Sequence, residues 1–174
     1  MKSLESLPLN HQNVIVRLDL NVPIQDGVIT DDNRILAVKL TLDYLIENHA
    51  KVIIMSHLGR IKSPEDKANN SLKPVAERLS EVMDRPVTFI EDTRGDALEN
   101  AIAHLKGGDL LMMENTRFED ADGNKESKND PELAAYWASL ADVFANDAFG
   151  TLHRAHASNV GIASHIKDKA PGFL

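Results

Sequence analysis

Short apolar runs alternate with amphipathic stretches along most of this chain. The runs are rich in Val, Ile, Leu and Met, as parallel strands buried on both faces are. Between them, apolar residues recur at helical spacing. The alternation predicts an α/β fold, a doubly wound parallel sheet with helices on both faces. We expect strands at about 13–18, 51–55, 86–90, 109–113 and 142–146, and helices with buried faces at 35–46, 72–83, 98–105 and 133–140.

The composition limits the classes of partner. The chain has 174 residues and 43% hydrophobic residues, which suits one soluble domain, and no apolar run approaches the roughly 20 residues that span a bilayer. The net charge of −8 disfavours nucleic acid and anionic membranes as partners. The chain has no cysteine and its N-terminus has no apolar signal core, so we expect a cytoplasmic protein without disulfides.

Polar and cationic residues follow four of the five apolar runs directly. The carboxyl ends of parallel strands lie at one edge of a sheet, where ligands of open α/β folds bind. Arginines after several strands would therefore converge on one anionic ligand. The four segments are Arg17-Leu18-Asp19-Leu20-Asn21-Val22-Pro23, Ser56-His57-Leu58-Gly59-Arg60, Glu114-Asn115-Thr116-Arg117-Phe118 and Asn146-Asp147-Ala148-Phe149-Gly150-Thr151-Leu152-His153-Arg154-Ala155-His156.

Some of these residues also have simpler interpretations. Strand alternation puts Arg17, Asp19 and Asn21 on one side, where they could bind a ligand, or Arg17 and Asp19 could form an ion pair. Arg34 opposes the helix dipole in a first helical turn, which suggests another use, although a solvent-facing Arg is common. The polar segments 61–71 and 119–130 are typical of solvated surface loops.

Several kinds of site lack their sequence signals. No Gly-x-Gly-x-x-Gly or Gly-x-x-x-x-Gly-Lys-Ser/Thr loop follows a strand, so a nucleotide site is not evident. No hydrolase elbow or cysteine nucleophile is present. His153 and His156 have a zinc-like spacing but no third ligand, and we expect no metal site. What remains is a cationic cleft suited to a small phosphorylated acid or to phosphoryl transfer.

Taken in order, the motifs resemble those of the phosphoglycerate kinase family from about residue 8 to residue 174. The resemblance covers that family's N-terminal domain, a Rossmann-like sheet that binds 3-phosphoglycerate or 1,3-bisphosphoglycerate. It implies that Mg-ATP or Mg-ADP binds to a C-terminal domain absent from this chain, and that this chain holds no cofactor. We therefore expect 1–174 to be a single, monomeric half-site domain, inactive alone, of a longer natural chain.

The resemblance also implies roles for individual residues. Asp19 and Asn21 would bind the glycerate end of the substrate, and Arg34 would be catalytic, stabilising the transferring phosphoryl group. Substrate-binding residues are implied at Asp19, Leu20, Asn21, Arg34, His57, Leu58, Gly59, Arg60, Arg117 and Arg154, and a supporting basic patch at Arg17, His153 and His156.

Two other interpretations stay open at this point. The chain could be a binding module for a different anion, or a folded scaffold without a ligand.

Overall fold

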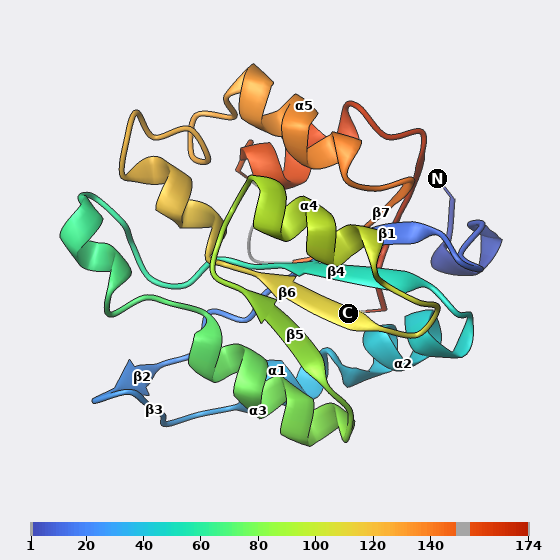
Figure 1. Cartoon of the computed structure of the whole chain (residues 1–174), viewed down its shortest axis with the longest axis horizontal. Coiled ribbons are helices and arrows are strands. Elements are labelled where there is room, and N and C mark those ends of the chain that lie inside the picture. The colour runs from blue at the N-terminus through green and yellow to red at the C-terminus, as the bar shows by residue number, and fades with distance from the viewer. Residues whose placement is uncertain (1, 149–153, 174) are drawn as a thin grey trace.

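The computed structural model describes residues 2–148 and 154–173. Its centre is a sheet with strand order β5-β6-β4-β1-β7-β8, and every neighbouring pair in it is parallel (Figure 1). The fold predicted from the strand–helix alternation is thereby confirmed. The strands are β1 (Asn13–Leu18), β4 (Lys51–Met55), β5 (Val87–Ile90), β6 (Leu110–Met113), β7 (Val143–Asp147) and β8 (Asp168–Pro171).

Helices cover both faces of the sheet. In Figure 1, α1 (Asn33–Ala37), α2 (Lys39–Glu47) and α3 (Lys73–Met83) lie below it, while α4 (Asp96–Ala103) and α5 (Pro131–Ser139) lie above it. Within this sheet the chain passes from β1 to β4 on one side, and after β6 it crosses to β7 on the other side of β1. The sheet order therefore reverses at β1, which is where open α/β sheets place their ligands.

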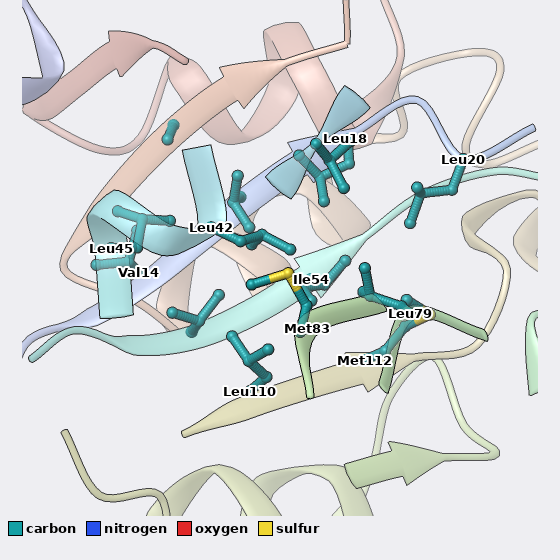
Figure 2. Packing of buried hydrophobic residues seen from close by; sticks show 14 of the residues in the cluster. Val14, Leu18, Leu20, Leu42, Leu45, Ile54, Leu79, Met83, Leu110 and Met112 are labelled. Carbon is teal, nitrogen blue, oxygen red and sulfur yellow. The ribbon is translucent and has the colours of Figure 1, made fainter. Parts of the chain in front are cut away.

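Strand alternation divides the core into two clusters. Val14 and Val16 of β1 pack with the α1–α3 side, whereas Ile15 between them packs with the α4–α5 side around Trp137. Figure 2 shows the first cluster, in which Leu42 and Met83 approach the sheet. Each fully buried side chain of this size contributes roughly 1.5–3 kcal/mol to folding. The strand ends that carry polar motifs thus project from a tightly packed sheet.

The structure adds elements that the periodicity did not predict. The segment expected as one helix at 35–46 is interrupted at Val38, although Ile35, Val38 and Leu42 are all buried on one face as expected. A hairpin of β2 (Ile24–Gln25) and β3 (Val28–Ile29) and the edge strand β8 are also new. Short helical turns occur at Leu4–Ser6, Pro64–Lys67, Thr116–Asp120 and Ala157–Gly161.

The expectation of a solvated loop at 119–130 is wrong for two of its carboxylates. Asp120 is buried and accepts hydrogen bonds from Ser127 N (2.8 Å) and Oγ (2.5 Å). Glu126 is fully buried against the turn at 157–161. Both carboxylates are buried because partners satisfy their oxygens, as burial of a charge requires.

Within the ranges that the structure describes, no helix is long and apolar enough to cross a bilayer.

Candidate functional site

A cavity of about 420 Å³ lies at the carboxyl ends of the central strands. Its lining residues follow β1, β4, β6 and β7, with one contribution from α1. Among the lining residues that the structure describes, four are arginines and only one is a carboxylate, so the cavity has an excess of positive charge although the chain is acidic. The lining residues are Asp19, Asn21, Arg34, His57, Gly59, Arg60, Arg117 and Arg154.

Arg34 reaches from α1 to the loop that follows β1. Its Nη1 donates to Asp19 Oδ1 at 3.0 Å and to the Asn21 carbonyl at 2.9 Å, while its side chain stays 53% exposed. A partly solvated ion pair of this kind adds little stability. The pair instead holds the guanidinium in the lining of the cavity, where a cation can contact an anionic ligand.

The turn after β4 brings backbone groups to the cavity. Gly59 has a φ of +61°, in the left-handed region that favours glycine. Its N–H donates to Asn21 Oδ1 at 3.0 Å, and its carbonyl accepts from Arg117 Nη1 at 3.0 Å. Asn115 secures the neighbouring backbone because its Nδ2 donates to the Leu58 carbonyl at 2.7 Å. The segments after β1, β4 and β6 are thus hydrogen-bonded to one another.

His57 lines the cavity as a neutral hydrogen-bond donor. Burial, with the charges of Arg17 and Arg117 adding to it, lowers the pKa of His57 from 6.5 to about 2. Arg17 Nη2 lies 2.8 Å from Nδ1, and because a guanidinium can only donate, Nδ1 is the acceptor. The ring hydrogen therefore lies on Nε2 and remains available for a ligand.

Arg17 itself does not line the cavity. It is fully buried, and its Nε donates to Ser158 Oγ at 3.0 Å and its Nη1 to the Leu18 carbonyl at 2.6 Å. Burial lowers the pKa of Arg17, and the charges of Glu126 and Asp19 oppose that effect. Asp19 forms its ion pair with Arg34, so the simple Arg17–Asp19 pair is not the arrangement found.

The other candidate residues that the structure describes lie near this cavity. Leu20 and Leu58 are buried beside the lining residues and do not contribute to the lining themselves. His156 is buried near Arg17 and Arg117, and burial lowers its pKa. His153 lies outside the described residues.

Three residues of this region were not predicted from the sequence: Asn115, Glu126 and Ser158. Asn115 stands inside the Glu114–Phe118 motif, so a role in this region was predictable from the sequence. Glu126 stands in a charged segment that resembles any surface loop, so its sequence context carries no such signal.

The geometry suits an anion better than a cation. Asp19, the one carboxylate among the described lining residues, is paired with Arg34. Across 2–148 and 154–173, no group of three or more His, Asp or Glu side chains is arranged to hold a metal ion. Arginines and a neutral imidazole N–H are donors suited to phosphate and carboxylate oxygens.

Comparison with known proteins gives a consistent result. The family model described as phosphoglycerate kinase matches residues 4–174. The chain is 61% identical over 173 residues to a phosphoglycerate kinase of Enterococcus faecalis, covering 99% of this chain and 44% of that one. It is 62% identical over 168 residues to that of Lacticaseibacillus casei, covering 97% and 42%. It therefore spans less than half the length of these curated relatives.

Solved structures agree with the sequence relatives. The phosphoglycerate kinase structure from Coxiella burnetii has a TM-score of 0.86 at 39% identity, over 99% of this chain and 42% of that one. The structure from Pyrococcus horikoshii has a TM-score of 0.87 at 36% identity, over 100% and 43%. By its sequence, its fold and its family match, this chain belongs to the phosphoglycerate kinase family.

Proposed function

We propose that this chain supplies the phosphoglycerate half of the active site of a phosphoglycerate kinase. The reaction of the whole protein would be ATP + 3-phosphoglycerate ⇌ ADP + 1,3-bisphosphoglycerate. In the direction of ATP formation, the bond from phosphorus to the C1 carboxyl oxygen breaks as a bond to the terminal oxygen of ADP forms. The cavity with four arginines around a neutral His57 is the observation that carries this proposal.

The residues of the cavity would have two roles, substrate binding and catalysis. Arg60, Arg117 and Arg154 would bind the phosphate and carboxylate oxygens of the substrate, and the Nε2–H of His57 would add a neutral donor. Asp19 and Asn21 would orient the glycerate end. Arg34, half-exposed in the lining, would stabilise the charge of the transferring phosphoryl group, because phosphoryl transfer depends mainly on positioning and charge stabilisation.

The nucleotide side of the reaction would come from outside this chain. The chain carries no Gly-rich nucleotide loop, and the residues that the structure describes include no metal-ligand cluster. We therefore propose that Mg-ATP or Mg-ADP binds to a second domain of the longer protein. We further propose a monomeric, cytoplasmic enzyme whose partners are 3-phosphoglycerate or 1,3-bisphosphoglycerate and that second domain, without nucleic-acid or membrane partners.

A titration of the 174-residue chain tests this proposal. Adding 3-phosphoglycerate should shift the amide signals of residues 57–60, 117 and 154, and glycerol at the same concentration should not. An absence of shifts would contradict the substrate assignment. A separate assay with ADP, Mg²⁺ and 1,3-bisphosphoglycerate should yield no ATP from this chain alone, since we propose that the nucleotide binds outside it.

A further inference from the structure

Glu126 and Ser158 lie outside the proposed substrate set but are connected to the cavity through Arg17. All three residues are fully buried. Ser158 donates to Glu126 twice, from its N–H to Oε1 at 2.8 Å and from its hydroxyl to Oε2 at 2.6 Å. The Glu126 carbonyl also accepts from the Ala157 N–H at 3.0 Å. The side chain and backbone of Glu126 therefore fix the turn that carries Ser158.

Arg17 connects this pair to the cavity, because it donates hydrogen bonds both to Ser158 and to His57. The Ser158 hydroxyl gives its hydrogen to Glu126, so its oxygen is free to accept from Arg17 Nε at 3.0 Å. Arg17 then donates from Nη2 to His57 Nδ1 at 2.8 Å. A carboxylate can only accept and a guanidinium can only donate, so the order of donors along Arg17, Ser158 and Glu126 cannot reverse.

The charges lead to the same arrangement. Arg17 is a buried cation next to a site rich in other cations, and a buried charge is stable only with a counter-charge and satisfied hydrogen bonds. Asp19 is engaged with Arg34 at 3.0 Å. Glu126 therefore supplies the buried negative charge that balances Arg17. Ser158 bridges the two groups, because its hydroxyl accepts from the Arg17 guanidinium and donates to the Glu126 carboxylate.

We propose that Glu126 and Ser158 are positioning residues of this site, which hold Arg17 so that His57 presents its Nε2–H to the bound phosphoglycerate. They do not touch the substrate themselves. Their role in catalysis rests on the proposed function, whereas the state of the His57 ring does not and can be measured without a ligand.

The primary experiment records the imidazole nitrogens of His57 by long-range ¹H–¹⁵N correlation in the 174-residue chain. In the unsubstituted chain Nδ1 should be the unprotonated nitrogen. In E126Q, which keeps the shape and removes the charge, and in S158A, which removes the hydroxyl between Arg17 and Glu126, His57 should lose this single tautomer. The matched control is E77Q, the same change at an exposed position in the middle of α3, which should leave the ring signals unchanged.

The affinity for 3-phosphoglycerate gives the second measurement. Loss of one well-oriented hydrogen bond should raise Kd by roughly two- to tenfold in E126Q and S158A.

Unchanged ring signals in both folded variants would overturn the proposal, as would a proton on Nδ1 in the unsubstituted chain. Failure of both variants to fold would assign them a purely structural role and overturn it too. Correct ring signals without any binding of 3-phosphoglycerate would contradict the proposed function alone.

Discussion

At the scale of single residues, His57 shows how burial decides chemistry. Its ring is neutral because burial and neighbouring cations lower its pKa to about 2. In the unfolded chain the ring would regain a pKa near 6.5, so below that pH the unfolded state binds a proton that the folded state does not. Folding stability should therefore be lost as the pH falls from about 6.5.

This gives a prediction for H57N. One such group steepens the fall of the unfolding free energy by up to about 1.4 kcal/mol per pH unit. Urea unfolding of H57N between pH 7 and pH 4.5 should therefore show a shallower fall than the unsubstituted chain. H165N, a change at an exposed histidine, is the control and should keep the original slope. Equal slopes for H57N and the unsubstituted chain would mean that His57 titrates normally.

Arg34 permits a prediction about catalysis in the full-length protein. R34A should lower kcat by roughly 100- to 1,000-fold, the usual loss for one charge-stabilising donor. It should weaken substrate binding much less, because the other arginines of the cavity remain. K39A removes a nearby exposed cation that pairs with Asp43, and its kinetics should match the unsubstituted enzyme. A loss confined to KM would favour a simple anion-binding module instead.

The position of a cavity residue was predictable where that residue belongs to one of the motifs that follow the strands. Each motif follows an apolar run, so strand topology alone brings Asp19, His57 and Arg117 to one edge of the sheet. Glu126 and Ser158 were not predictable in this way. They are 32 residues apart, and their pairing depends on how the turn after β7 folds back onto the 119–130 segment. Hydrophobic periodicity contains no information about such contacts.

At the scale of elements, the turn after β4 depends on Gly59. Alanine there would have to adopt a φ of +61°, and its Cβ would lie 2.2 Å from Asn70 Oδ1. The Asn70 side chain can move, but moving it breaks its 2.7 Å hydrogen bond to the Asp66 carbonyl. Gly27, in the hairpin between β2 and β3, has a φ of +78°, but nothing lies within 4 Å of the position that a Cβ would take there. An alanine at position 27 would therefore experience backbone strain alone, whereas an alanine at position 59 would also be crowded by Asn70.

The prediction compares G59A with G27A by urea unfolding. G27A should lose about 1–2 kcal/mol of unfolding free energy from the left-handed backbone alone. G59A should lose about 0.5–1.5 kcal/mol more, the value of the hydrogen bond that Asn70 gives up. G59A should also weaken binding of 3-phosphoglycerate, since Arg117 donates to the Gly59 carbonyl. A smaller loss in G59A than in G27A would contradict this account of the turn.

Elements were predictable where a long apolar pattern defines them. The five expected strands all occur within one residue of their predicted ends. β8 is only four residues long and contains Pro171, which lacks an N–H and is tolerated at the sheet edge that β8 forms. The hairpin did have a signal, because Asp26-Gly27 is a favoured tight turn between the pairs Ile24-Gln25 and Val28-Ile29. The interruption at Val38 preserves the buried face, so the spacing of apolar residues does not reveal it.

At the scale of the whole molecule, the chain has a net charge of −8, whereas its cavity is lined by four arginines. Salt should therefore act on stability and on binding with opposite signs. Screening reduces the self-repulsion of the acidic chain, which favours the compact state. The same screening weakens the attraction between the exposed arginines of the cavity and a phosphorylated acid.

The corresponding prediction concerns the chain between low salt and about 0.5 M NaCl. The melting temperature of the ligand-free chain should rise, while Kd for 3-phosphoglycerate should increase by roughly three- to tenfold. Differential scanning fluorimetry and the amide titration measure the two effects on the same sample. R154A should show a weaker salt dependence of Kd than the unsubstituted chain, because it removes one exposed cation from the lining. If Kd does not respond to salt, hydrogen-bond geometry rather than charge holds the ligand, and the excess of arginines needs another explanation.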